Sequence, residues 1–117
     1  MKPEDKHLLL VDLSERLPYG VKLKHIPTNE ITTLEFIGKF TIDGDIHDVI
    51  ENFSVCLFPL SSMTEEQIKE FNSITQKCST YIGKSILLTD FCNKHHIDWR
   101  GLIEKGLAID ATGKNIY

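Results

Sequence analysis

The feature that most constrains this fold is a change of hydrophobic period along the chain. Residues 3–17 carry Leu9, Leu13 and Leu17 at four-residue intervals, the spacing of one face of a helix. Residues 21–58 then alternate apolar and polar positions and are rich in β-branched and aromatic residues, which is typical of strands. Helical spacing returns after residue 63. This order predicts an α+β domain with an N-terminal helix.

Local signals place the ends of these elements. Glu4 and Asp5 favour a helix start near Pro3, and the run LPYG at 17–20 ends that helix. The runs VKLKH, ITTLEFI, KFTI and FSVCLF predict a small antiparallel sheet of three to four strands. PTNE at 27–30 and Asp43-Gly44 have the composition of turns. Residues 45–53 fit a short helix as well as a strand, so both remain open.

The second half of the chain predicts two to three helices packed on one face of the sheet. Thr64 and Gln67 have the spacing of a capping box, so a helix should start at Thr64. Its buried stripe should be Ile68, Phe71, Ile74 and Cys78. Residues 84–96 predict a further helix whose inward residues are Leu87, Leu88, Phe91 and Cys92.

The C-terminal segment predicts a short last helix and a strand. Asp98 is placed to cap a helix over residues 99–105, and Gly106 is placed to end it. The tail at 107–117 should add an edge strand. With 117 residues, all of these elements fit one globular domain, 1–117.

Charge and composition limit the classes of partner. Lys and Arg total 13 against 17 Asp and Glu, and no basic run is present, so we expect no binding to duplex nucleic acid. No apolar run approaches the roughly 20 residues that span a bilayer, and acids follow the first lysine, so we expect a cytoplasmic protein without membrane contact. Cys56, Cys78 and Cys92 contain no C-x-x-C pair and should be buried thiols.

The run HHIDWRG at 95–101 concentrates the residue types that carry chemistry. Cys92, His95, His96 and Asp98 could supply metal ligands, but only two of them share a helix face, and a zinc site needs three or four ligands. The chain also lacks the G-x-S-x-G, H-E-x-x-H, P-loop and G-x-G-x-x-G motifs. We therefore expect no metal, no cofactor and no catalytic residues.

The same run favours recognition of a ligand or a partner. Aromatic faces could stack on a base, and the cationic side chains of Arg16, Lys22 and Arg100 could bind phosphates or carboxylates. Trp is often buried and Arg is often paired, so Trp99 could instead fill the core and Arg100 could pair with an acid such as Asp98 or Glu104. The candidate ligand-binding residues are Tyr19, Lys22, His96, Trp99 and Arg100.

Three stretches resemble one family. They are LPYGVK at 17–22, LFPLSSMTEEQ at 57–67 and HHIDWRGLIEKGLAID at 95–110. They resemble small, largely uncharacterised proteins of gut Bacteroidales and of their phages and mobile elements. In those proteins the last motif reads HHFDYRGLI, so Ile97 and Trp99 here stand in place of two aromatic residues. Residues 28–51 and the ending GKNIY depart from the family pattern.

The resemblance implies a setting and supplies no catalytic residues. The resemblance implies an accessory factor that binds a host component and is not an enzyme. One hypothesis is a protein that evades host defence by sequestering a nucleotide signal or another small anionic ligand, as a homo-oligomer. The alternative is a protein–protein interaction module that docks on a host or virion protein, and a metal-dependent enzyme is a third, less favoured hypothesis. A concave pocket with convergent donors would favour the first, and an exposed apolar patch would favour the second.

Overall fold

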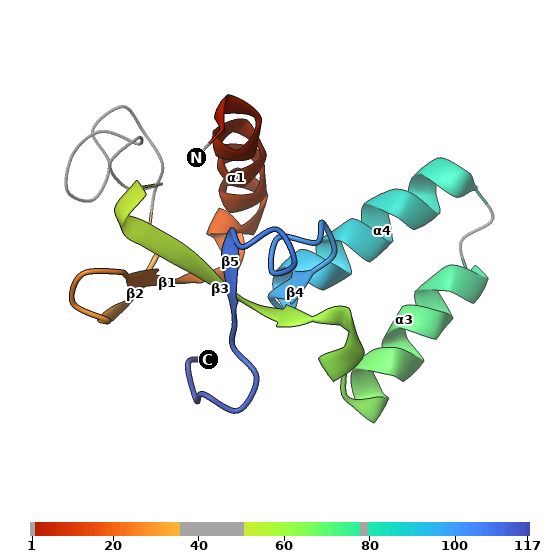
Figure 1. Ribbon diagram of the computed structural model, residues 1–117. Coiled ribbons are helices and arrows are strands. Elements are labelled where there is room, and N and C mark those ends of the chain that lie inside the picture. The colour runs from red at the N-terminus through yellow and green to blue at the C-terminus, as the bar shows by residue number, and fades with distance from the viewer. Residues whose placement is uncertain (1, 36–50, 78–79) are drawn as a thin grey trace.

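The computed structural model describes residues 2–35, 51–77 and 80–117 and confirms the α+β class (Figure 1). The N-terminal helix is present, and two helices lie in the second half of the chain as predicted. The helices are α1 (Pro3–Arg16), α3 (Glu65–Lys77) and α4 (Tyr81–Lys94), with short 3₁₀ helices η1 (Leu17–Tyr19) and η2 (Leu60–Ser62). The strands are β1 (Lys22–His25), β2 (Ile31–Thr33), β3 (Phe53–Pro59), β4 (Ile97–Asp98) and β5 (Ala108–Asp110).

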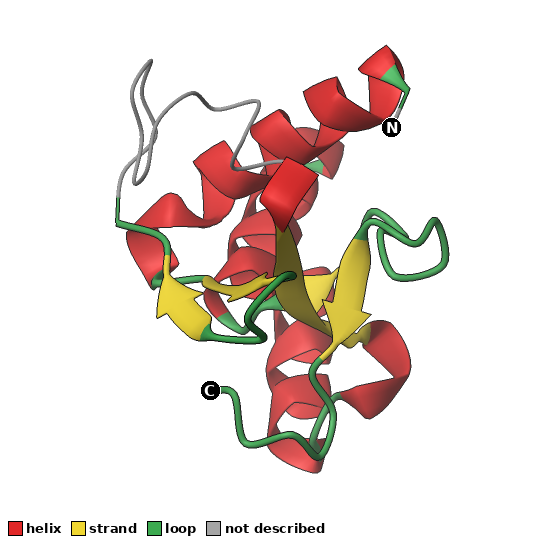
Figure 2. Ribbon diagram, turned by 60° about the vertical axis from the view of Figure 1, so that its left-hand side comes forward, coloured by secondary structure: helices red, strands yellow, loops and turns green. Residues whose placement is uncertain are grey.

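The sheet is built around β3 and is mixed. β1 runs antiparallel to β2, with Lys22 opposite Thr33, and antiparallel to β3, with Leu23 opposite Val55. The antiparallel pairing predicted for the strands of residues 21–58 is thus confirmed for β1, β2 and β3, whereas β4 and β5 both run parallel to β3 and make the sheet mixed. A parallel pair needs a crossover connection, and α3 and α4 supply it between β3 and β4. The strands cross at changing angles, as in a twisted sheet (Figure 2).

The main core lies between α1 and the sheet. Leu9 and Leu13 are 4% exposed, which confirms the inward leucine face of α1. From the strands they meet Leu23, Val55 and Leu57, all almost fully buried. The rest of this core consists of apolar residues from the turns around the strands: Val21, Leu34, Leu102 and Leu107.

A second, smaller core joins α3 and α4 to β4. Its buried members are Phe91, Cys92 and Ile97, and the partly buried side chains of Met63, Phe71, Ile74 and Trp99 pack against them. The two helices lie side by side at the end of the molecule away from β1 and β2 (Figure 1). Ile68 and Leu87 are therefore uncovered, with exposed fractions of 43% and 46%, and the prediction that both point inward is wrong.

Two predicted caps are present, but one predicted helix is not. The main-chain N–H of Gln67 donates to Thr64 Oγ1 at 3.1 Å, and the N–H of Thr64 donates to Gln67 Oε1 at 3.0 Å, which completes the capping box. Asp98 accepts from the N–H groups of Leu102 and Ile103. Residues 99–105 nevertheless form a series of turns, because Gly101 adopts a left-handed φ of +75° that a helix cannot contain.

The strand predicted in the tail is confirmed as β5. Other predictions fall on residues that the structure does not describe. The KFTI run, Asp43-Gly44, residues 45–50 and Cys78 lie outside the described residues. Cys56 and Cys92 are buried free thiols, as expected. Within the described part of the chain, no helix has the length and apolar character required to cross a bilayer.

Candidate functional site

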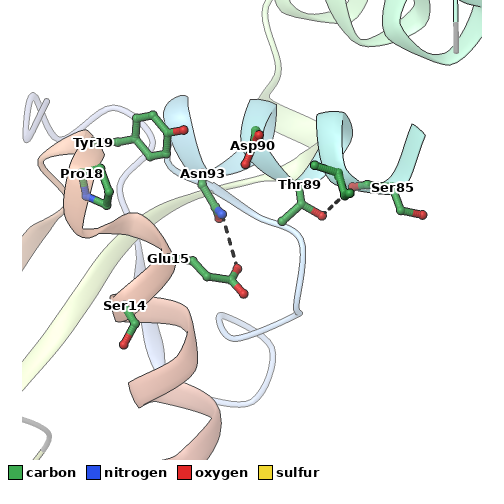
Figure 3. Close-up of a pocket in the computed structure, with 9 residues that line it drawn as sticks. Ser14, Glu15, Pro18, Tyr19, Ser85, Thr89, Asp90 and Asn93 are labelled. Atoms are coloured by element: carbon green, nitrogen blue, oxygen red, sulfur yellow. Dashed lines mark hydrogen bonds between the residues drawn. The ribbon is translucent and has the colours of Figure 1, made fainter. Parts of the chain in front are cut away.

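A groove of about 540 Å³ lies between the C-terminal end of α1 and one face of α4 (Figure 3). Glu15 comes from α1, Tyr19 from η1, and Ile86, Asp90 and Asn93 from α4. The remaining lining residues are Ser14, Pro18, Ser85 and Thr89. The groove thus combines an aromatic ring, an isoleucine, hydroxyl groups and two carboxylates.

Local sequence explains how both walls are formed. Pro18 lies in η1, and Gly20 follows with φ of +68°, so the chain turns back toward β1 and leaves Tyr19 38% exposed. On α4, Ile86, Thr89 and Asn93 are three and four residues apart and share one face. Ile82 lies one turn before Ile86 and is 73% exposed, so it extends this face beyond the groove.

A network of charged side chains lies beside the groove. Asp12 and Arg16 are fully buried, and Arg16 Nε donates to Asp12 Oδ2 at 2.9 Å. Arg16 Nη2 donates to the carbonyl oxygen of Ile97 at 2.7 Å. Arg100 Nη1 donates to Asp12 Oδ1 at 2.9 Å, and its Nη2 donates to Glu15 Oε2 at 2.8 Å. The network therefore ties α1 to the segment that follows α4.

Trp99 joins this network to the second core. Its indole N–H donates to Asn93 Oδ1 at 3.0 Å, and the Arg100 guanidinium carbon lies 3.9 Å from its ring centroid. The ring is partly buried against Phe91 and Cys92, and it also borders a cavity of about 520 Å³ that contains Ser61 and Glu104. Trp99 therefore contributes to the core and also presents part of its surface to solvent.

The five predicted ligand-binding residues do not form one site. Tyr19 lines the groove, whereas Trp99 and Arg100 lie at the second cavity. Lys22 Nζ donates to Thr33 Oγ1 at 2.6 Å on the sheet. Arg100 pairs with Asp12 and Glu15 on α1, which confirms the alternative that it pairs with acids, although the partners are not Asp98 or Glu104.

His96 packs against the C-terminal residue. Its ring stacks on Tyr117 with centroids 3.9 Å apart and an angle of 13° between the planes. The Tyr117 hydroxyl donates to the carbonyl of Cys56 at 2.6 Å and accepts from the N–H of Lys22 at 2.8 Å. Burial lowers the pKa of His96 to about 4, with the nearby charge of Arg16 acting in the same direction. The neutral imidazole is therefore part of the structure at pH 7.

The residues considered as metal ligands point to different partners. Cys92 is packed in the second core, and burial raises the pKa of its thiol. The His95 ring lies against Phe91 with centroids 4.7 Å apart, and Asp98 caps Leu102 and Ile103. Over the described ranges, no three His, Cys, Asp or Glu side chains are grouped as a metal site requires.

Sequence reasoning missed Asp12, Glu15 and Asn93, and it considered Arg16 as a cation for a ligand rather than as the partner of Asp12. A signal for Asp12 was present, because Asp12 and Arg16 follow Leu9 and Leu13 at helical spacing and therefore share their buried face. An ion pair four residues apart on the inward face of a helix predicts a buried polar network. Nothing local in the sequence indicates that Arg100 completes it.

No protein-family model, curated protein or solved structure matches the chain.

Proposed function

We propose that this protein is a non-enzymatic protein–protein interaction module, and that its partner docks on α4 beside the groove. We define the docking face as Tyr19, Ile82, Ile86 and Asp90 with the groove between them. The observation that carries the proposal is the exposure of large apolar side chains at the start of α4. Tyr81 is 85% exposed, Ile82 73% and Ile86 57%. Contiguous exposed apolar residues beside a polar rim are typical of interaction sites.

The composition of α4 supports a covered helix. The run YIGKSILL at 81–88 places apolar residues on every side of the helix, a pattern that indicates burial on all faces. In the described structure only its C-terminal residues Phe91, Cys92 and Asn93 are buried. Complete burial of an isoleucine contributes about 1.5–3 kcal/mol. A partner that covers Ile82 and Ile86 would therefore gain a substantial part of its binding free energy from these two side chains.

The geometry favours this function over sequestration of a nucleotide. A nucleotide site needs free donors that converge on phosphates. Both terminal nitrogens of Arg100 already donate to carboxylates, and Lys22 Nζ donates to Thr33. The groove itself is lined by Glu15 and Asp90, which would repel an anion. The family resemblance suggests a host or virion protein as the partner.

Site-specific photo-crosslinking tests the proposal. A photoreactive phenylalanine analogue at Ile82 should crosslink a partner in cells that produce the protein. The same analogue at Ile26 is the matched control, because Ile26 is 54% exposed but lies directly after β1, away from α4. The double variant I82D/I86D should lose the partner, whereas Ile26→Asp should keep it. Retention of the partner by a correctly folded I82D/I86D protein would exclude the docking face.

A further inference from the structure

We propose that the groove binds one basic side chain, Lys or Arg, that the partner presents beside its apolar contact residues. This inference rests on the proposed function and specifies the chemistry of the partner. The partner segment would place apolar side chains on Ile82 and Ile86 and a cation between α1 and α4.

The first argument is charge. The charged residues that line the groove are Glu15 and Asp90, and none of the described lining residues is Lys, Arg or His. Asp12 and Glu15 are matched by Arg16 and Arg100 in the adjoining network. Asp90 is not matched within that network, so the three carboxylates exceed the two guanidinium groups by one. A single cation from a partner would restore the balance.

The second argument is the direction of the hydrogen bonds in the groove. The Ser14 hydroxyl donates to the carbonyl of Leu10 at 2.7 Å, and the Thr89 hydroxyl donates to the carbonyl of Ser85 at 2.8 Å. Both hydroxyl protons are thus used within their own helices, and the oxygens remain as acceptors. Carboxylates at pH 7 also accept only. Of the donors in the groove, the Asn93 amide already donates to Glu15 Oε2 at 3.4 Å, and the hydroxyls of Tyr19 and Ser85 can also accept. The acceptors are complementary to an ammonium or guanidinium group, which only donates.

The third argument is the aromatic wall. Tyr19 lies at the end of the groove near Asn93, and Pro18 lies next to it (Figure 3). The face of an aromatic ring attracts a cation, and apolar walls accommodate the methylene stem of Lys or Arg. Ile86 lines the groove and is one helical turn from Asp90. The two surfaces would therefore select a basic residue that lies close to an apolar one.

Selection from a library of phage-displayed random 12-residue peptides tests this preference. The wild-type protein should enrich peptides in which Lys or Arg lies close to large apolar residues, and I82D/I86D should fail to bind them. Asp90→Lys should bind the selected basic peptides poorly and should enrich acidic ones. Ile26→Asp is the control and should enrich the same peptides as wild type.

Calorimetry with the best selected peptide gives the second measurement. Replacing its basic residue by Met, or replacing Asp90 by Asn, should weaken binding about 5- to 20-fold, and the two changes together should cost little more than either alone. Peptides that need Ile82 and Ile86 but carry no basic residue would overturn this inference and leave the proposed function intact. If no selected peptide depends on Ile82 and Ile86, both proposals are wrong.

Discussion

Arg100 pairs with Asp12, a residue 88 positions earlier in the chain, with 2.9 Å between Arg100 Nη1 and Asp12 Oδ1. Asp12 also accepts from Arg16, so one fully buried carboxylate lies between two guanidinium groups. This arrangement fixes α1 against the segment after β4. It also occupies the arginine that the sequence suggests for ligand binding.

Asp12→Asn should destabilise the protein more than Arg100→Gln. Removing the carboxylate leaves Arg16 buried without its counter-charge, which costs about 3–5 kcal/mol. Arg100→Gln leaves the Asp12–Arg16 pair in place and should cost about 1–3 kcal/mol. Urea unfolding followed by circular dichroism measures both. Equal losses of stability in the two variants would contradict the prediction that Arg16 is destabilising when it is buried without the Asp12 carboxylate.

Two substitutions of Trp99 separate its roles in packing and hydrogen bonding. Trp99→Phe keeps a ring in the second core but removes the hydrogen bond to Asn93, and should cost about 1–2 kcal/mol. Trp99→Ala also leaves a cavity against Phe91 and Cys92, and should cost about 3–5 kcal/mol. Thermal unfolding by circular dichroism compares the two variants. Wild-type stability in Trp99→Ala would contradict a structural role for this ring.

The protein should become less stable as the pH is lowered, because His96 is protonated more readily in the unfolded chain. Burial lowers the pKa of its folded form to about 4, against an ordinary value of 6.5. Between these two values the unfolded chain binds a proton that the folded protein does not, so the free energy of unfolding decreases as the pH falls from 6.5 to 4. Above this window the contribution of His96 is constant.

His96→Asn should reduce this pH dependence. Asparagine does not titrate and tolerates the left-handed backbone at this position, where φ is +59°. Urea unfolding at pH 7, 5.5 and 4.5 gives the slopes for both proteins. Tyr117→Phe is the control, because it keeps the ring that stacks on His96 but loses the hydroxyl bonds, and should therefore be less stable with the slope retained. An unchanged slope in His96→Asn would assign the dependence to other groups.

Asp98 should hold the turns after β4 in place. Its two carboxylate oxygens each accept one main-chain N–H, from Leu102 and Ile103, both at 2.9 Å. Asp98→Ala should cost about 2 kcal/mol, and Asp98→Asn should lose less because one acceptor oxygen remains. Hydrogen exchange of the Leu102 and Ile103 amides should be faster in Asp98→Ala. Unchanged exchange would show that other contacts protect them.

Features that depend on neighbouring residues were predictable from the sequence. The capping box joins Thr64 to Gln67, and the Asp98 cap reaches only to Ile103, so residue type and spacing contain all the required information. The leucine face of α1 is likewise a local pattern. In each case the structure follows the periodicity or the side-chain chemistry of one short segment.

Features that depend on distant segments were not predictable. The parallel pairing of β3 with β4 and β5 depends on the route of the chain through α3 and α4. The apolar residues of α4 indicate what must be covered, but they do not show that Ile82 and Ile86 are 73% and 57% exposed in the described structure. The ion pairs of Arg100 were not predictable for the same reason, because its partners Glu15 and Asp12 lie 85 and 88 positions away.

The attachment of Tyr117 to β1 and β3 also has a consequence for synthesis on the ribosome. The hydroxyl of Tyr117 bonds the carbonyl of Cys56, which is 61 residues earlier, and β5 pairs with the same part of β3. At about 5–20 residues per second, the ribosome adds those residues in roughly 3–12 s. For most of this interval β3 lacks β5, and an unpaired strand edge can pair with other chains. The sheet is therefore most open to aggregation while the nascent chain is still growing.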